Sequence, residues 1–357
     1  MTGVKLFNRT MLLATAPFLG MLIWMTVTTI TLELSDEAFP KDGNTAPVQA
    51  GQYTNEVAKG LDTAAETAVQ TAESLHTSIS LYEKTTEEMN RVVRIAAAQA
   101  GRPAIIYDRR ITSKLGAPAD TVQSDKLRAQ LFYVQAQNFK GYALKVKLKK
   151  AEGMAMVLGN DTFGGAETTL SAVNRYDAVA GITAGGFADQ DGRRYPLSTT
   201  VMNGEYVNGF EPTFSDLFFV GINKSLKLVG GKYSSREELD KEEVLFGASF
   251  VPILLKNGVN QPIPKKWQNS PKRAPRTVIA NYKDDQLLFL VTDGSDESGR
   301  SGASLAELQI LLKRYGAVDA YNLDGGGSST LIFKGKVINQ PSDGQLRKLA
   351  THFIFFE

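Results

Sequence analysis

The sequence predicts a mixed α/β chain of the α+β class, in which a membrane helix and a long helical stalk precede a domain built mainly from strands. Three observations support this: an uncharged apolar run near the N-terminus, a long apolar stripe at helical spacing, and short apolar runs separated by turns from Pro103 onward. The expected parts are a cytoplasmic tail (1–9), a transmembrane helix (10–32), a linker and stalk (33–101) and a domain (102–357).

The first element is the apolar run from Thr10 to Leu32, which contains no charged residue. At about 1.5 Å per residue it is long enough to cross a hydrocarbon core of about 30 Å. Lys5 and Arg9 precede the run, and acidic residues follow it from Glu33. The positive-inside rule then predicts a single-pass membrane protein with its large domain extracytoplasmic. The competing interpretation is a cleaved signal peptide, for which the apolar run is long and a small-residue cleavage site is missing.

The second element is a helix to about Ala100, predicted by apolar or small residues that recur at alternating spacings of three and four. The stripe consists of Val57, Leu61, Ala64, Ala68, Ala72, Leu75, Ile79, Tyr82, Met89, Val93 and Ala96. One interpretation is a stalk that self-associates as a coiled coil, and the other is a helix that folds back onto the domain.

Composition limits the classes of function. With 357 residues, of which 43% are hydrophobic, the chain can bury a large core. Its net charge of +2 and the lack of a long basic block give no indication of a nucleic-acid partner. It contains no cysteine, which excludes disulfides, thiolate zinc sites and cysteine nucleophiles.

The third part, from Pro103, is expected to be rich in strands. The predicted β-type segments are AIIYD, YALKVKL, AMVLG, VAGITAGGF, LFFVGI, SFVPILL, TVIANY, QLLFLVTDG and THFIFF. One helix is well specified, because Ser304 and Glu307 form a capping-box pattern before an apolar face and Gly316 stands at the expected stop.

This helix connects two predicted strands, each of which ends at an acid. Gln286 to Val291 leads to Asp293, and Ala317 to Leu323 leads to Asp324. A strand–helix–strand unit normally makes its two strands parallel, so both carboxylates are expected at the same sheet edge, where α/β folds build their sites. The alternative is that both acids are ordinary Asp-Gly turn residues.

Asp324 opens the run Asp-Gly-Gly-Gly-Ser-Ser, and three consecutive glycines cost stability unless the backbone needs φ > 0 or a close approach. Amides exposed by the turn, with the hydroxyls of Ser328 and Ser329, suit an anion such as phosphate. The run is not a P-loop, and a hairpin around Lys334-Gly335 is expected to follow it.

The stretch AVDAYNLDGGGSSTLIFKGKVINQPSDGQLRK, with RAPRTVIA, TDG, FVGINK and AGITAGGF upstream, resembles the phosphodiester glycosidase domain family. The resemblance runs from about Phe139 to Phe356. It implies hydrolysis of a sugar joined through its anomeric oxygen to a phosphodiester, without a nucleotide cofactor. No other cofactor and no metal-binding residue is predicted.

The resemblance implies catalytic roles for Asp324, Asp293 and Arg276, with Arg276 binding phosphate oxygens through its guanidinium fork. The residues it implies for substrate binding are Asn322, Gly325, Gly326, Gly327, Ser328, Ser329, Thr183, Gly185, Gly186 and Phe187. Two positions depart from the family pattern: Thr183 stands where Asn is usual, and Ser295 where Arg is frequent.

Three hypotheses follow from these features. The first is a membrane-anchored hydrolase that cleaves a sugar from a phosphorylated glycan in envelope polymer or exopolysaccharide. The alternative is a non-catalytic glycan- or phosphopolymer-binding module of the same fold, which the two departures favour. The third is a cation-binding structural domain, suggested by the acids Asp293, Asp296 and Glu297 and by Asp189 and Asp191.

Overall fold

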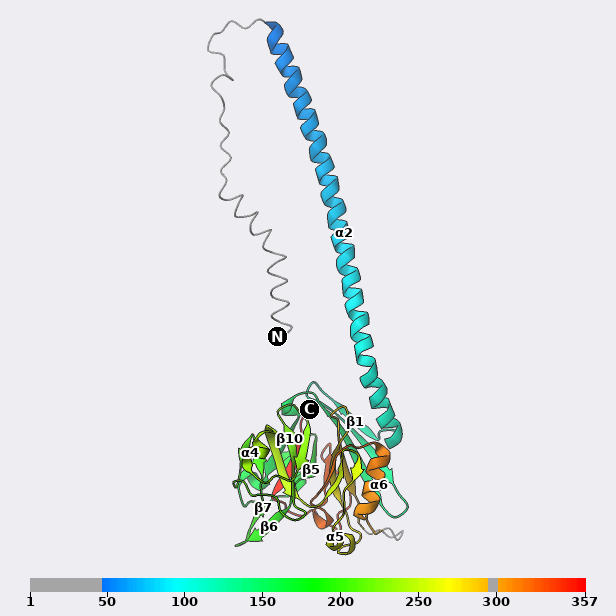
Figure 1. Cartoon of the computed structure of the whole chain (residues 1–357), viewed down its shortest axis with the longest axis vertical. Coiled ribbons are helices and arrows are strands. Elements are labelled where there is room, and N and C mark those ends of the chain that lie inside the picture. The colour runs from blue at the N-terminus through cyan, green and yellow to red at the C-terminus, as the bar shows by residue number, and fades with distance from the viewer. Residues whose placement is uncertain (1–46, 295–300) are drawn as a thin grey trace. The chain divides into compact units, whose positions relative to one another are not determined.

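The computed structural model of the protein describes residues 47–294 and 301–357 (Figure 1). The predicted tail and transmembrane segment lie outside these residues. Within the described ranges, no helix is long and apolar enough to span a membrane. The chain divides into two compact units, with the boundary between Arg94 and Ile95.

The predicted stalk is a single helix, α2 (Pro47–Leu115), which confirms the helical stripe and extends it beyond Ala100. The strand predicted at AIIYD is wrong, because these residues belong to α2, which continues through Pro103. A proline inside a helix costs about 3 kcal/mol. The later turns offset this cost by burying Ile111 and Leu115 in an apolar cluster of the domain.

The end of α2 also supplies the partners of a buried lysine. Lys145, only 2% exposed, donates from Nζ to Asp108 Oδ1 at 2.6 Å and to Thr112 Oγ1 at 2.9 Å. Burial raises the pKa of Asp108, but the hydrogen bond and charge of Lys145 outweigh it and hold that pKa below its usual value. The last turns of α2 therefore belong to the domain both by packing and by charge.

Within the described residues the strands form three sheets and one ribbon, in which all neighbouring strands are antiparallel. The large sheet has the order β1 (Asp120–Gln123), β2 (Leu127–Gln135), β3 (Lys140–Leu148), β16 (Leu287–Thr292), β15 (Thr277–Asn281), β17 (Ala320–Leu323), β13 (Ile253–Lys256), β14 (Val259–Asn260). A second sheet has the order β11 (Leu228–Gly231), β10 (Phe218–Asn223), β12 (Val244–Phe250), β8 (Val201–Met202), β9 (Glu205–Tyr206). The third has the order β19 (Lys336–Val337), β18 (Leu331–Phe333), β5 (Ala180–Thr183), β20 (Thr351–Phe355), β4 (Met154–Leu158), and the ribbon pairs β6 (Phe187–Gln190) with β7 (Arg193–Pro196).

Short helices complete the domain. They are α3 (Thr169–Arg175), α4 (Arg236–Asp240), α5 (Lys265–Asn269), α6 (Leu305–Tyr315) and the 3-10 turns η2 (Ala151–Gly153), η3 (Gly159–Asp161) and η4 (Gly326–Ser328). The predicted capping box of α6 is confirmed, and Gly316 ends the helix with φ +89°. The hairpin of β18 and β19 around Lys334-Gly335 is also as predicted.

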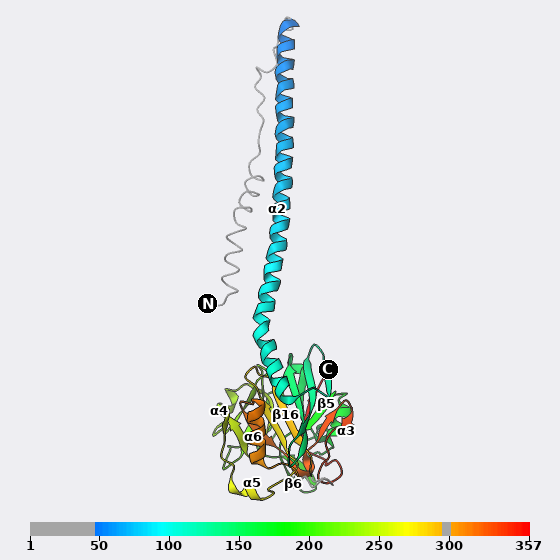
Figure 2. The same cartoon turned by 90° about the vertical axis from the view of Figure 1, so that its right-hand side faces the viewer.

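The three sheets surround one apolar core. Leu144 of the large sheet, Phe246 of the second and Phe353 of the third belong to the same buried cluster. Successive residues of β16 point to opposite faces, so that Phe289 enters this core while Leu290 packs in the cluster that contains α6. Figure 2 shows α6 lying along the large sheet beside β16. Because β16 is buried on both faces, it reads in the sequence as a continuous apolar run.

The unit β16–α6–β17 determines where Asp293 and Asp324 lie in the fold. Val291 of β16 and Leu323 of β17 both pair with Thr277 of β15, so β16 and β17 run parallel to each other with β15 between them. Asp293 and Asp324, which follow these strands, lie at one sheet edge two strand spacings apart, or about 10 Å. The prediction that both acids end parallel strands at one edge is confirmed.

Two truncated chains distinguish the contribution of the end of α2 from that of its earlier turns. A chain that begins at Arg102 keeps Asp108, Ile111 and Leu115, and we expect it to fold with a free energy of unfolding close to that of the full chain. A chain that begins at Ala117 loses both partners of Lys145 and the burial of Ile111 and Leu115, which together should cost about 3–5 kcal/mol. Urea unfolding of the two truncated chains measures the difference. Equal stabilities would show that the end of α2 contributes nothing to the domain.

Candidate active site

Asp324 is the central acid of the sheet edge. It follows β17, and its backbone amide donates to the carbonyl of Ala184 at 3.3 Å. Its Oδ2 atom is buried and has no hydrogen-bond partner among the described residues. Burial raises the pKa of Asp324 to about 6, although the Ser328 hydroxyl, the Gly325 amide and the charges of Arg347 and Arg194 act in the opposite direction. A carboxyl that titrates near neutral pH is suited to acid–base chemistry.

Asp293 lies at the same edge in a different environment. It is half-buried, its Oδ1 accepts a hydrogen bond from the Gln340 amide at 2.7 Å, and its own amide donates to the Lys140 carbonyl at 3.0 Å. Gln340 begins the segment Gln340–Lys348, which later reaches the glycine turn through Arg347. One segment therefore contacts the surroundings of both acids.

A side chain in place of each glycine after Asp324 would meet a different obstacle. A side chain at Gly325 would approach the Pro275 carbonyl to 3.0 Å. Gly326 has φ +62°, which favours glycine. A methyl group at Gly327 would overlap the Asp343 carboxylate and the Arg347 guanidinium, which pack directly on this residue. The turn thus needs glycine for its backbone conformation at Gly326 and for the close approach of a backbone carbonyl at Gly325, whereas at Gly327 the neighbours are the ends of two flexible side chains.

The amides of this turn are used inside the protein. Gly326 donates to the Pro275 carbonyl at 2.8 Å, and Ser328 and Ser329 donate to the carbonyls of Gly325 and Gly326, both at 3.1 Å. The expectation that the turn offers open amides to an anion is wrong for these three residues, because a 3-10 turn satisfies its own N–H groups. The Ser328 and Ser329 side chains are fully buried, and the Ser329 hydroxyl lies 3.3 Å from that of Thr277.

Of the other residues implied for substrate binding, three serve packing and one is a half-buried aromatic side chain. Thr183 is fully buried, donates its hydroxyl to the Ser328 carbonyl and accepts from the Thr330 amide at 3.1 Å. A side chain at Gly185 would meet Ala248 at 2.5 Å, and one at Gly186 would meet the Phe250 ring at 2.7 Å. These three residues therefore fasten β5 and the following turn to their neighbours.

Phe187, by contrast, begins the β6–β7 ribbon. The guanidinium of Arg194 lies 4.0 Å from the centre of its ring, a cation–π geometry that holds the arginine in place.

Asn322, like Asp324, has a buried side-chain oxygen without a hydrogen-bond partner among the described residues. Its Nδ2 donates to the Val251 carbonyl at 2.6 Å, while its buried Oδ1 lacks a partner in the described part of the chain. Asn322 is the third residue of β17 and Asp324 directly follows the last residue of that strand, so the two lie close together along the chain. Buried acceptors without donors are rare in folded proteins. The pair is suited to receive hydrogen bonds from a ligand hydroxyl group.

Arg276 does not have the environment expected of a phosphate-binding arginine. Its side chain is buried, with Nη2 donating to the Pro271 carbonyl at 2.9 Å and Nε to the Ala303 carbonyl at 3.4 Å. Burial lowers its pKa. The guanidinium thus ties two backbone segments together beside the site, and the geometry favours a structural role for it.

Two arginines that the sequence analysis did not single out act on Asp324 instead. Arg194 of β7 holds Asp189 through Nε at 2.7 Å and Nη2 at 2.8 Å. Arg347 holds Asp343 through Nη2 at 2.5 Å and reaches Ser328 Oγ through Nη1 at 3.4 Å. Both charges lower the pKa of Asp324. The two arginines come from segments that are far apart in the chain. The only indication of either in the sequence is that Arg347 lies within the stretch that resembles the family.

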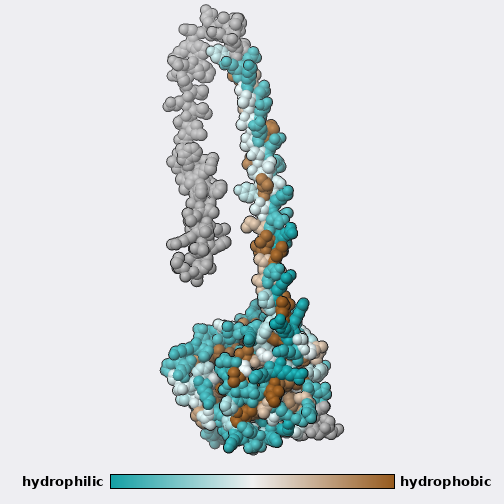
Figure 3. Space-filling model, turned by 45° about the vertical axis from the view of Figure 1, so that its right-hand side comes forward, coloured by the Kyte–Doolittle hydropathy of each residue, from teal (hydrophilic) through white to brown (hydrophobic). Residues whose placement is uncertain are grey.

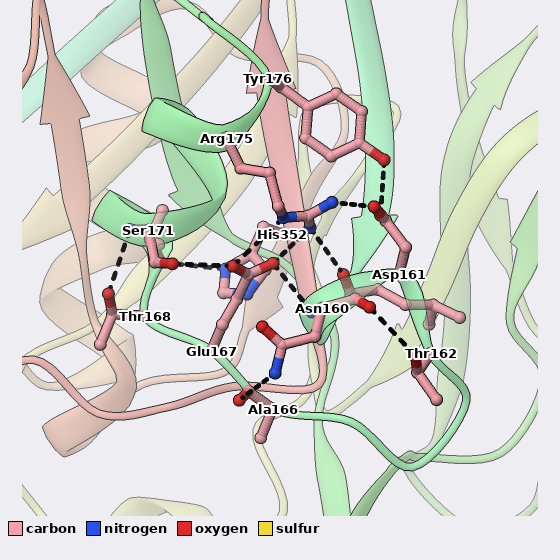
Figure 4. Close-up of polar contacts among 12 residues, drawn as sticks. Asn160, Asp161, Thr162, Ala166, Glu167, Thr168, Ser171, Arg175, Tyr176 and His352 are labelled. Carbon is pink, nitrogen blue, oxygen red and sulfur yellow. Dashed lines mark hydrogen bonds and ion pairs between the residues drawn. The ribbon is translucent and has the colours of Figure 1, made fainter.

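A second polar cluster, drawn in Figure 4, joins α3 to the loop after β4. Arg175 pairs with both Asp161 and Glu167, and Glu167 also accepts from Ser171 Oγ at 2.9 Å. Burial and the charge of Arg175 lower the pKa of His352 to about 3, so that this histidine is neutral. The acids are charge-compensated, and the cluster is structural.

Asp296 and Glu297, two acids of the cation-binding hypothesis, lie outside the described residues, as does Ser295. No group of three or more His, Cys, Asp or Glu residues suited to a metal ion occurs among the described residues. Asp189 of the suggested calcium loop is bound by Arg194.

The mixed α/β domain thus places a carboxyl at the end of a strand, close to two arginines and a glycine turn. The family model of phosphodiester glycosidases matches residues 176–356, and the chain belongs to this family.

Curated relatives cover only part of the chain. It is 31% identical over 137 residues to N-acetylglucosamine-1-phosphodiester alpha-N-acetylglucosaminidase of Bos taurus, covering 34% of this chain and 26% of that protein. It is 26% identical over 181 residues to the SPbeta prophage-derived uncharacterized protein YomE of Bacillus subtilis, covering 50% of this chain and 28% of that protein. The matched part therefore spans about a quarter of the length of these relatives.

Solved structures share the fold. The catalytic domain of zebrafish N-acetylglucosamine-1-phosphodiester alpha-N-acetylglucosaminidase, described as auto-inhibited by its pro-peptide, superposes with a TM-score of 0.54 at 20% identity. The match covers 68% of this chain and 87% of that one. A hypothetical protein from Synechocystis gives a TM-score of 0.50 at 15% identity, covering 68% of this chain and 64% of that one.

The raised pKa of Asp324 predicts a pH-dependent stability. Because the folded-state pKa of about 6 lies above the ordinary aspartate value of 3.8, the contribution of Asp324 to the free energy of unfolding is fully present below pH 3.8 and is lost as the pH rises through 6. We expect Asp324→Asn to be more stable than the wild type above pH 7, by up to about 3 kcal/mol, and equal to it below pH 4. His352 changes the stability with pH in the opposite direction, because its pKa is lowered. This contribution is the same in both proteins and cancels when their free energies of unfolding are subtracted at each pH. A pH-independent difference would contradict the assignment.

The glycine turn is tested by two matched substitutions. Gly326→Ala places a side chain at φ +62°, with no described atom within 4 Å of it, and should lower the free energy of unfolding by about 1 kcal/mol. Gly327→Ala should instead displace the flexible Asp343 and Arg347 side chains at small cost in stability. Thermal unfolding and a crystal structure of each variant separate these effects. An unmoved Asp343–Arg347 pair in Gly327→Ala would contradict the packing argument.

Proposed function

We propose that the protein is a hydrolase that releases a sugar from a glycosyl phosphodiester. The observation that carries this proposal is the Asp324 carboxyl, whose Oδ2 is buried without a partner among the described residues, whose pKa is raised to about 6, and on which the charges of Arg194 and Arg347 act. Membership of the phosphodiester glycosidase family and the printed activity of the bovine relative support the same chemistry.

The residue types fit each requirement of the reaction. Cleavage at an anomeric carbon passes through an oxocarbenium-like state, which a carboxylate stabilises as nucleophile or as base for water. Asp324 is ionised above pH 6 and takes this role. Arg194 and Arg347 present planar forks to the phosphate oxygens, and a phosphate leaves readily without strong acid assistance. Substrate phosphate takes the positions that Asp189 and Asp343 hold on these arginines.

The location and substrate belong to the same proposal. The uncharged run Thr10–Leu32 and the charges around it support a single-pass membrane anchor with the domain outside the cytoplasm. An enzyme held there meets phosphorylated glycans of the envelope or exopolysaccharide.

A non-catalytic binding module of the same fold is the second candidate. The observation that favours it is Thr183, whose hydroxyl is occupied by the Ser328 carbonyl and the Thr330 amide where the family usually carries Asn. Such a module binds phosphorylated glycan without releasing sugar.

Three substitutions test the catalytic proposal on synthetic sugar 1-phosphodiesters, with release of free sugar as the readout. Asp324→Asn keeps the shape of the side chain but removes its charge, and we expect kcat to fall by about 10²–10⁴ with folding intact. Arg347→Lys loses the planar fork and should mainly raise KM. Arg276→Lys is the matched control, which should lower the unfolding temperature more than it changes KM.

Wild-type turnover in Asp324→Asn would defeat the assignment of this residue. Tight binding of the phosphodiesters by the wild type without release of sugar would favour the binding module. Sugar release that is abolished by a chelator would instead show a metal requirement.

A further inference from the structure

The side chains of residues 53–100 of α2 are all exposed, although many are apolar. Leu75, Ile79 and Tyr82 keep 58%, 55% and 76% of their surface open. Figure 3 shows hydrophobic side chains spaced along this helix. Most of the stability of a helix in water comes from packing of its apolar face, so a helix of this length is expected to have a partner.

The apolar face of α2 repeats every seven residues. Written as a heptad, its d positions are Leu61, Ala68, Leu75, Tyr82, Met89 and Ala96, and its a positions are Ala58, Ala65, Ala72, Ile79, Thr86, Val93 and Ala100. The neighbouring g positions are Val57, Ala64, Thr71, Ser78, Thr85, Val92 and Gln99. No residue at these a, d or g positions is charged, and every charged residue from 57 to 100 occupies b, c, e or f.

A strict seven-residue repeat identifies the kind of partner. In a straight α-helix such a repeat drifts by about 20° per heptad, so it stays in contact only with a second helix that supercoils around the first. The repeat continues from Val57 to Ala100, about 65 Å at 1.5 Å per residue, and ends before Pro103. The partner is therefore a helix of comparable length.

We propose that α2 forms a parallel, two-stranded coiled coil with α2 of a second copy of this chain, in register over residues 57–100. In a parallel coiled coil, β-branched side chains at a, here Ile79, Thr86 and Val93, with Leu61 and Leu75 at d favour two strands over three or four. The uncharged g positions face the e positions of the other copy, so self-pairing meets no like-charge repulsion. The twenty a, d and g residues on each helix match the 20–30 residues per side of a stable interface.

Three of the hydroxyls on this face are already satisfied by carbonyls of the same helix. Thr71 and Thr85 donate to the carbonyls of Thr67 and Leu81 at 2.7 Å, and Thr86 donates to that of Tyr82 at 2.8 Å. Burying them against a second helix therefore leaves none of these three donors unpaired. The pairing is independent of the proposed hydrolysis.

Single cysteines test the pairing, because the full chain contains none of its own. Leu75→Cys at d and Ile79→Cys at a face the seam, whereas the matched control Thr77→Cys at f faces away from it. After mild oxidation of the full chain in dilute detergent solution, the first two should run as covalent dimers on a non-reducing gel and the control as a monomer. Equal crosslinking at all three positions, or none at 75 and 79, would overturn the proposal.

A second measurement does not depend on crosslinking. Sedimentation of the wild-type full chain, corrected for bound detergent, should give the mass of two chains. The double variant Leu75→Lys/Tyr82→Lys places like charges opposite each other in the seam and should give the mass of one chain, with the circular dichroism of the strand-rich domain retained. A wild-type mass of one chain, or of three or more, would refute the two-stranded pairing.

Discussion

The candidate site depends on one strand pairing. β15 lies between β16 and β17 and is antiparallel to both, with Thr277 facing Val291 on one side and Leu323 on the other. This pairing aligns the ends of two strands that are distant in sequence, and so brings Asp293 and Asp324 to one edge. A shift of one residue in either pairing would turn the side chains of that strand to the opposite face. Apolar burial on both faces of β16 keeps the register fixed.

Around this edge, close packing replaces the open anion nest suggested by the glycines. Segments from three parts of the chain meet at the turn after Asp324: Thr183 bonds its last carbonyl, Pro275 accepts its amide, and Arg347 packs on Gly327. The turn therefore acts as a junction that holds the surroundings of Asp324 in place. Preorganised surroundings of this kind are what a reacting carboxyl requires.

The pKa of Asp324 results from two opposing effects. Removal from water favours the protonated form of Asp324, and two arginines favour the charged form. Each arginine is itself bonded to a carboxylate, Asp189 or Asp343, which reduces the net positive charge near Asp324. The result is a carboxyl that titrates near neutral pH.

The sequence by itself determined the elements whose signals are local. The apolar repeat predicted α2, the capping box and Gly316 predicted α6, and the apolar runs predicted the two strands that are each followed by an acid. It also determined that Asp293 and Asp324 share an edge, because a strand–helix–strand unit fixes the direction of both strands. Pro103 misled the prediction at residues 104–108, since its local cost is outweighed by burial of Ile111 and Leu115, which no local pattern shows. Only the tertiary structure decided which arginines act on Asp324, since Arg194 and Arg347 approach it from separate segments while Arg276, adjacent to β15, turns to backbone carbonyls. Side-chain charges interact through space, and their neighbours are set by long-range packing that short stretches of sequence do not specify.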